Sequence, residues 1–313
     1  METTADPTLL DAVDARTRLA GSNKMEILLF SLGTRETFGI NVFKVREVTK
    51  TPVITKTPNM PSGVEGVISL RGNIIPVINL ARFVSGAEHV TSVGTTMMVT
   101  EYSRRTQGFL VAAVDRIVRV DWDKVRSPES VVGGQDGSLI TAITELPGGK
   151  LVSILDVEQI LANAFGEPHI PELEPVPETS EAMVFFADDS LVARKEICQV
   201  LDRLNVKYHQ ATNGQEAWNR LQSMALRAAQ DNEPLDQQLS LILVDAEMPE
   251  MDGYVLTRHI KADRRFDGVP VVMHSSLSSA ANRAMGKTVG VDAYVAKFDP
   301  VVLADTLRPL LQK

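Results

Sequence analysis

Five polar residues in the C-terminal half stand where short apolar runs end, and together they could handle phosphate and a divalent cation. They are Asp188, Asp189, Asp245, Ser275 and Lys297. Each run has the length of a buried strand and is followed by a helix-length segment, which predicts a parallel sheet covered by helices on both faces. Because the carboxyl ends of parallel strands open at one edge of a sheet, we expect the five side chains to share one cleft.

Three carboxylates held close together repel one another, and a hard divalent cation removes that cost. Mg²⁺ takes a few carboxylate oxygens, keeps several waters and bridges readily to phosphate oxygens. A carboxylate can also attack phosphorus and form an acyl phosphate. Phosphoryl transfer depends mostly on positioning and charge neutralisation. We therefore predict a Mg²⁺-dependent site in which Asp245 accepts a phosphoryl group, Lys297 neutralises its charge and Ser275 donates a hydrogen bond to it.

Simpler explanations exist for each residue taken alone. An aspartate at a strand end is more often a helix cap or a solvated loop residue, and Asp188 or Ser190 could simply cap the helix that follows. A lone serine or lysine in such a position carries almost no information. The occurrence of all five at successive strand ends favours a shared site over coincidence.

Strands and helices alternate in this half from about residue 182. The expected strands are MVFFADD, KYHQAT, LSLILVDAE, VPVVMHSS and AYVAK. The expected helices cover Ser190–Leu204, Gln215–Gln230, Gly253–Lys261, Ser279–Val289 and a last segment from Asp299. The loop before the third strand, DNEPLDQQ, is long for such a domain. The pattern predicts five parallel strands with helices between them.

This half resembles the response-regulator receiver domain. The motifs that carry the resemblance are FFADDS, LILVDAEMPEMDGYVL, VVMHSS and DAYVAK. The resemblance implies an α/β flavodoxin-like (CheY-like) fold with a five-stranded parallel sheet and a bound Mg²⁺. It implies that Asp245 is the phosphoacceptor, that Asp189 is a direct metal ligand and that Asp188 acts mainly through metal-bound water. The backbone carbonyl of Glu247 would complete the metal site.

The resemblance also assigns residues to a conformational switch. Ser275 would be the switch hydroxyl, Ser276 its small neighbour and Tyr294 the aromatic residue that rotates with it. Lys297 would bind the phosphoryl group. Receiver domains usually carry a cis proline directly after this lysine, whereas here Phe298 follows it. The isomer of that peptide bond is therefore open.

The N-terminal half has a different pattern. Between residues 25 and 165, short runs rich in Val and Ile are broken by Gly, Pro or Asn, which predicts an all-β barrel or sandwich. Helices are expected over Thr8–Leu19, in an N-terminal extension of residues 1–24, and over Asp156–Phe165. Residues 166–181 hold four prolines and five glutamates and predict a semi-extended linker. The receiver domain would then cover residues 182–313.

Two ordered motifs in the β-rich half resemble the CheW coupling-protein family. They are FSLGTRETFGINVFKVREV and GVISLRGNIIPVINL. The resemblance covers residues 25–165 and implies two small five-stranded barrels that link chemoreceptor tips to the chemotaxis histidine kinase. By position in the motifs, Val45, Glu47, Gly66 and Arg71 fall in the region that contacts these partners. No constellation for catalysis stands out in this half.

A CheW-like domain followed by a receiver is the layout of the CheV-type coupling proteins, which the whole chain resembles. The resemblance implies a signalling adaptor and not an enzyme, apart from autocatalytic phosphorylation and dephosphorylation of Asp245. Expected partners are a CheA-type chemotaxis histidine kinase and the cytoplasmic tips of methyl-accepting chemoreceptors, with CheW as a further candidate. Phosphorylation could serve adaptation or drain phosphoryl groups as a sink. The alternative is a purely structural adaptor whose receiver is non-functional.

Composition excludes several other classes. The chain has 313 residues, a net charge of −8 and no Lys/Arg run, which argues against binding nucleic acid. A single cysteine, Cys198, and the lack of a signal peptide or a long apolar run predict a cytoplasmic protein without membrane insertion, associated with receptor arrays. We expect no DNA-binding segment after the last helix. An aspartate-based phosphohydrolase would carry Asp-x-Asp where this chain has Asp245–Ala246–Glu247.

Overall fold

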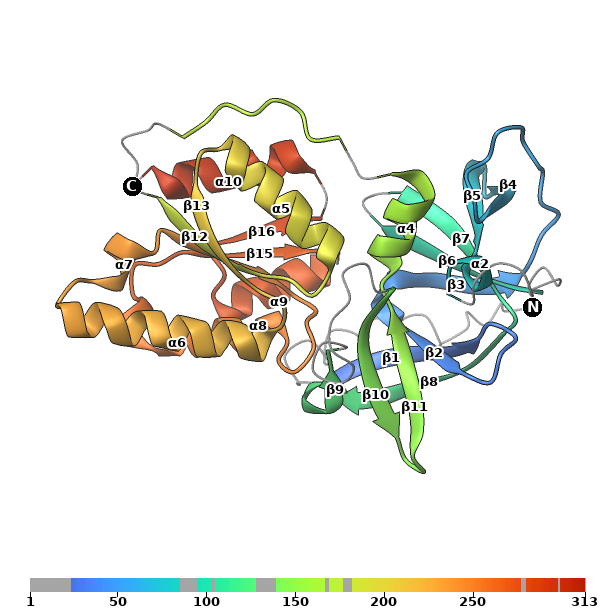
Figure 1. Cartoon of the computed structure of the whole chain (residues 1–313), viewed down its shortest axis with the longest axis horizontal. Coiled ribbons are helices and arrows are strands. Elements are labelled where there is room, and N and C mark those ends of the chain that lie inside the picture. Colours follow the sequence, from blue (N-terminus) through green and yellow to red (C-terminus); the bar gives the residue numbers. More distant parts are fainter. Residues whose placement is uncertain are drawn as a thin grey trace, which may run out of the picture.

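The protein has a β-rich N-terminal lobe and an α/β C-terminal lobe (Figure 1). A computed structural model describes residues 24–84, 95–102, 105–127, 139–166, 169–176, 182–276, 280–297 and 299–312. The helix predicted in the N-terminal extension and the peptide bond after Lys297 lie outside these residues. Among the residues that the structure describes, no helix is long and apolar enough to cross a bilayer.

The N-terminal lobe is built on two β-sheets, which confirms the all-β prediction. One sheet has the strand order β8-β1-β2-β11-β10-β9 and the other β3-β6-β7-β5-β4. The first sheet contains β1 (Lys24–Ser31), β2 (Thr37–Asn41), β8 (Ala113–Asp121), β9 (Val125–Arg126), β10 (Ile140–Leu146) and β11 (Lys150–Leu155). The second contains β3 (Val45–Lys50), β4 (Val64–Leu70), β5 (Asn73–Asn79), β6 (Thr96–Tyr102) and β7 (Arg105–Val111). The first sheet has one strand more than the five expected because the two-residue β9 extends its edge.

Short helices connect and cover these sheets. They are the 3₁₀ turns η1 (Val42–Lys44) and η2 (Trp122–Lys124), and the helices α2 (Leu80–Val84) and α4 (Val157–Phe165). The start of α4 is fixed by Asp156, whose carboxylate accepts a hydrogen bond from the backbone N–H of Gln159 at 2.9 Å. The apolar side of α4 packs into the core of the lobe through Val157 and Ile160. The helix is thereby held rigidly, with its first turn available for contacts outside the core.

The C-terminal lobe is a five-stranded parallel sheet, as the alternating pattern predicts. Its strand order is β13-β12-β14-β15-β16. The strands are β12 (Met183–Ala187), β13 (Lys207–Ala211), β14 (Leu241–Asp245), β15 (Val271–Ser275) and β16 (Ala293–Ala296). The helices are α5 (Leu191–Arg203), α6 (Gly214–Asp231), α7 (Leu235–Gln238), α8 (Gly253–Ala262), α9 (Ala280–Val289) and α10 (Pro300–Leu311), with the 3₁₀ turn η3 (Arg264–Phe266). The one-turn helix α7 lies in the long loop before the third strand and is anchored by buried Leu235.

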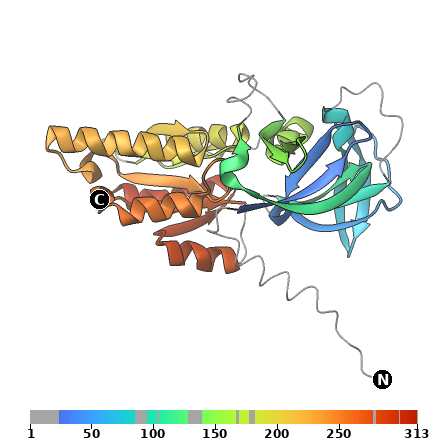
Figure 2. The ribbon, with the colours of Figure 1, turned by 90° about the horizontal axis from the view of Figure 1, so that it is seen from below.

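Helices cover both faces of this sheet (Figure 2). One face packs against α5 and α10, through side chains such as Val200 and Leu307. The other packs against α6 and α8, through side chains such as Leu221 and Leu256. Since both faces are buried, the free edge for polar chemistry is the one at which the strands end.

Part of the predicted linker packs on the receiver. Residues 169–176 form neither helix nor strand, and Ile170 and Val176 are buried against α5 and α10. The Val176 N–H donates to the Leu204 carbonyl at 2.9 Å. Arg308 donates from Nη2 to the Glu174 carbonyl at 3.0 Å. The boundaries at residues 24, 165 and 181 stay predictions, but this stretch is tied to the receiver on its surface.

Candidate functional site

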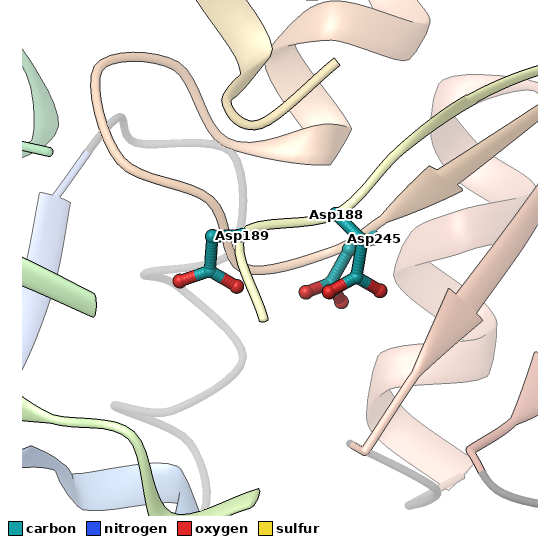
Figure 3. Close-up of side chains that lie close together, drawn as sticks. All are labelled: Asp188, Asp189 and Asp245. Atoms are coloured by element: carbon teal, nitrogen blue, oxygen red, sulfur yellow. The ribbon is translucent and has the colours of Figure 1, made fainter. Parts of the chain in front are cut away.

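Three carboxylates gather where β12 and β14 end (Figure 3). Each of Asp188, Asp189 and Asp245 offers a carboxylate oxygen, and these oxygens lie within 4.8 Å of one another. Asp188 and Asp245 are buried, whereas Asp189 is half-buried. The parallel register that pairs Ala187 with Val244 brings the two strand ends level, so the acids meet without any distortion of the sheet.

Lys297, which follows β16, joins two of these acids. Its Nζ lies 2.6 Å from Asp188 Oδ2 and 2.9 Å from Asp245 Oδ2. The Lys297 N–H also donates to the Ser275 carbonyl at 2.9 Å, which fixes the start of the side chain beside the end of β15. Burial by itself lowers the pKa of Lys297, but the charges of Asp188 and Asp245 outweigh it and hold the pKa well above its usual value. The ammonium is therefore a permanent positive charge in the cluster.

The carboxylates remain short of positive charge despite this lysine. Burial raises the pKa of Asp188 to about 7, against the opposing effect of Lys297. Burial likewise raises the pKa of Asp245 to about 7 and that of Asp189 to about 8, opposed by Lys297 and Lys44 respectively. Groups whose ionised form is disfavoured by burial and by like charges gain most from a nearby cation. A cluster of hard oxygen donors with this deficit fits Mg²⁺.

The capping role considered for Asp188 and Ser190 is also present. Ser190 is the N-cap of α5 and accepts from the Ala193 N–H at 3.4 Å. Asp188 Oδ1 accepts from the Ser190 N–H at 3.0 Å, while its other oxygen meets Lys297. Capping and clustering are therefore not exclusive, because the two oxygens of Asp188 are used separately.

The predicted switch residues lie on the neighbouring strands β15 and β16. Ser275 is fully buried at the end of β15, and Ser276, which follows it, is half-buried. Burial raises the pKa of Tyr294 to about 12, and a hydrogen bond with Ser275 acts in the opposite direction. The side chains of Tyr294 and Ser275 are thus in contact. Whether the two move together is a prediction.

Gly253 also shapes the site, although the sequence analysis included it only as part of the motif LILVDAEMPEMDGYVL. A Cβ atom at Gly253 would lie 2.0 Å from the backbone oxygen of Asp245. The Gly253 N–H donates to the Ala246 carbonyl at 3.0 Å. The start of α8 therefore presses against the strand end that carries Asp245, and only glycine leaves room for it.

Three further residues at the site come from the N-terminal lobe, and sequence reasoning missed them. Asn41 Nδ2 donates to the Glu247 carboxylate. Lys44 lines a pocket between the lobes together with Asp189 and Glu247. Glu158, on α4, accepts a hydrogen bond from the Ser276 hydroxyl at 3.4 Å. No local sequence signal pointed to them, because each belongs to a domain without a catalytic motif of its own.

The residues predicted to contact partners lie on the second sheet of the N-terminal lobe. Arg71 Nη2 lies 2.5 Å from Glu47 Oε2, and the Arg71 side chain is 79% exposed. Glu47 is on β3 and Arg71 follows β4, so the two end strands of the sheet curl toward each other. Gly66 is buried at a register shift, where a Cβ would lie 2.4 Å from the Thr55 carbonyl oxygen. Val45 packs against the core, which leaves Glu47 and Arg71 as the accessible pair.

Comparison with known proteins decides the family. The chain is 31% identical to the chemotaxis protein CheV3 of Helicobacter pylori over 279 residues, which cover 88% of this chain and 89% of that protein. The chain belongs to the CheV family of chemotaxis proteins. CheV1 and CheV2 of the same organism are 27% and 26% identical and align with 97% and 96% of this chain, and with 98% of each relative.

The two lobes of this CheV-family chain match separate domain families. The CheW-like domain family matches residues 26–165, and the response regulator receiver domain family matches residues 184–308. Both resemblances drawn from the sequence motifs are thereby confirmed. The acidic cluster of the CheV-family receiver is of the kind that binds Mg²⁺ in receiver domains.

Proposed function

We propose that this CheV-family protein couples chemoreceptors to the chemotaxis histidine kinase, and that the kinase phosphorylates Asp245. One observation carries the proposal: Lys297 bonds both Asp188 and Asp245 inside a cluster of three carboxylates. Replacement of a buried ion pair by apolar residues is often neutral or stabilising, so stability alone does not explain why a lysine is buried between two acids. A positive charge is useful where an anionic phosphoryl group arrives. The CheW-like lobe supports the coupling half of the proposal.

In the proposed reaction, a carboxylate oxygen of Asp245 attacks the phosphorus of a phosphohistidine on the kinase. The new O–P bond forms as the N–P bond breaks, and the imidazole nitrogen keeps the electron pair. Lys297 neutralises the charge of the phosphoryl oxygens, and the Ser275 hydroxyl donates a hydrogen bond to one of them. Mg²⁺ would supply the remaining neutralisation, held by Asp189, Asp245 and the Glu247 carbonyl. Asp188 orients Lys297 and would act on the cation mainly through metal-bound water.

Readout of the phosphoryl group would use Ser275 and Tyr294. Movement of the hydroxyl toward the phosphoryl group draws the tyrosine with it and changes the face formed by α9 and β16. A change of that face alters how the receiver and the coupling domain dock. If phosphorylation serves adaptation, addition of a phosphodonor should change kinase activity in reconstituted receptor arrays. If the receiver serves as a phosphate sink, it should drain phosphoryl groups and leave the coupling unchanged.

The decisive experiment incubates the full chain with Mg²⁺ and a phosphorylated histidine kinase domain. Wild-type protein should gain phosphate that alkali or hydroxylamine releases, as an acyl phosphate does, and Asp245→Asn should gain none. Asp202→Asn, which changes an exposed aspartate on α5, is the matched control and should behave as wild type. Absence of phosphate on the wild type, or equal labelling of Asp245→Asn, would favour the structural adaptor with a non-functional receiver.

A further inference from the structure

The N-terminal lobe lies against the edge of the receiver that carries the acidic cluster (Figures 1 and 2). The Glu250 N–H, in the loop after β14, donates to the Trp122 carbonyl at 3.2 Å. Asn41 donates to the carboxylate of Glu247 in the same loop. On the other side of the cluster, α4 packs against α5. The contacts thus surround the strand end at which Asp245 sits.

Glu158 is the acidic residue of the N-terminal lobe that faces the cluster. Its side chain is only 2% exposed, and Oε1 lies 3.4 Å from the Ser276 hydroxyl and 3.6 Å from Lys44 Nζ. It stands in the first turn of α4, which Asp156 caps and which packs into the lobe's core. Because α4 is packed into the core of the lobe, the backbone of Glu158 is fixed beside Ser276, and separation of the lobes would break this contact.

Lys44 supplies the matching positive charge. It ends η1 and lines the interlobe pocket with Asn41, Asp189 and Glu247. Burial by itself lowers the pKa of Lys44, but Glu158, Glu247 and Asp189 outweigh it and raise the pKa above its usual value. The lysine is therefore bound electrostatically from both lobes at once. A half-buried cation among acids of both lobes thus contributes an attraction between the lobes.

We propose that Asn41, Lys44 and Glu158 form an intramolecular docking surface that closes the receiver over Asp245, and that docking and phosphorylation exclude each other. The second half rests on the proposed function, since it requires that Asp245 accept a phosphoryl group. The N-terminal lobe contacts Glu247, Glu250 and Ser276, which follow β14 and β15 at the edge that holds Asp245, so it stands where a kinase domain would have to approach. Docking therefore slows phosphorylation.

The negative charge of the phosphoryl group makes the exclusion act in the other direction too, so that phosphorylation weakens docking. Phosphorylation turns the single negative charge of Asp245 into an acyl phosphate that carries about −2. Glu158 accepts a hydrogen bond from Ser276, the residue directly after the Ser275 hydroxyl that would bond the phosphoryl group. Added negative charge opposite a fixed, buried carboxylate disfavours the docked arrangement, so phosphorylation releases the coupling domain. By linkage, the factor by which docking weakens phosphorylation equals the factor by which phosphorylation weakens docking.

The test measures docking and phosphorylation separately on the full chain. Lys44→Glu places a fourth acid among Glu158, Asp189 and Glu247 and should separate the lobes. Without any phosphodonor, hydrogen exchange at the Glu250 amide should then become at least about 5-fold faster, since its partner carbonyl is on the other lobe. With a phosphorylated histidine kinase domain and Mg²⁺, labelling of Asp245 should accelerate by a similar factor. Lys150→Glu, at an exposed lysine beginning β11, is the matched control and should change neither rate.

A second variant tests the charge argument without breaking the interface. Glu158→Gln keeps a hydrogen-bond acceptor for Ser276 but removes the negative charge. In the wild type, phosphorylation should speed exchange at the Glu250 amide, and in Glu158→Gln this increase should be smaller. An increase of the same size in both proteins would overturn the role of Glu158.

The outcomes separate the two proposals. Unchanged exchange at Glu250 in Lys44→Glu would refute the docking surface. Faster exchange with unchanged labelling would refute the exclusion, and slower labelling would mark Lys44 as a phosphate ligand instead. Wild-type protein that gains no phosphate while Lys44→Glu exchanges faster would refute the proposed function and confirm the docking surface.

Discussion

The ammonium nitrogen of Lys297 lies 2.9 Å from a carboxylate oxygen of Asp245, and both side chains are almost completely buried. On the protein surface such an ion pair would contribute little to folding stability. When the pair is buried, the loss of either partner leaves an uncompensated charge in the interior. The pair joins the ends of β14 and β16, which are separated in the sheet by β15. A single ion pair thus spans the edge at which the proposed chemistry takes place.

Replacement of Lys297 should leave the repulsion between Asp188 and Asp245 uncompensated and destabilise the receiver. Lys297→Met leaves two buried carboxylates without their shared cation, and we expect the free energy of unfolding of the receiver to fall by about 3 kcal/mol in EDTA. Mg²⁺ should still bind and restore part of the loss, whereas labelling by the kinase should fall at least about 10-fold. Urea denaturation with and without Mg²⁺ measures the first effect. Lys261→Met, which removes an exposed ion pair with Asp292, should cost under about 1 kcal/mol, and equal losses in the two variants would contradict the argument.

Mg²⁺ should stabilise the folded receiver. Binding to the native state alone raises the free energy of unfolding by about 2.7 kcal/mol when the ion is present at about 100 times its dissociation constant. Asp189→Asn should abolish most of that gain at the same Mg²⁺ concentration, because it removes a proposed ligand. Thermal unfolding with a Mg²⁺ series measures both proteins. Asp202→Asn is the control, and a gain in Asp189→Asn as large as in the wild type would exclude Asp189 as a ligand.

A methyl group at position 253 should disturb the phosphoacceptor. Gly253→Ala places a Cβ 2.0 Å from the Asp245 backbone oxygen, so either α8 or the end of β14 must shift. Overpacking of this kind costs about 1–3 kcal/mol, and labelling of Asp245 should fall with it. Wild-type stability of Gly253→Ala in urea denaturation would show that the contact relaxes freely.

Charge reversal at the exposed end of the second sheet should weaken coupling. Arg71→Glu faces Glu47 with a like charge and removes the cation from the predicted contact region. Co-sedimentation with receptor–kinase arrays should decrease, while folding stability changes by less than about 1 kcal/mol. Arg119→Glu, at an exposed arginine paired with Glu26 on the other sheet, is the matched control. If both variants sediment like the wild type, the contact surface lies elsewhere.

Two elements, the strand β3 and the helix α7, were not predicted from the sequence, and the reason can be given for each. The strand β3 (VREVTK) alternates between half-buried and exposed positions, so its apolar signal is weak. The helix α7 lies in a stretch whose proline and acidic residues predict a loop, and it forms because Leu235 is buried and α7 packs against α6 and η3. Tertiary context decides in both cases, through pairing with β6 for β3 and through burial of Leu235 for α7. Neither element carries a residue of the acidic cluster.

The sequence by itself determined the chemistry of the receiver. Parallel strands place whatever follows them at a common edge, so the order of strands and helices was enough to bring Asp188, Asp245 and Lys297 together. Only the tertiary structure decided what covers that edge. Asn41 and Glu247 are 206 residues apart, and no periodicity encodes which surfaces of two lobes meet. Their docking depends on the fit of charges such as half-buried Lys44 and buried Glu158, which acquire a role only once both lobes have folded.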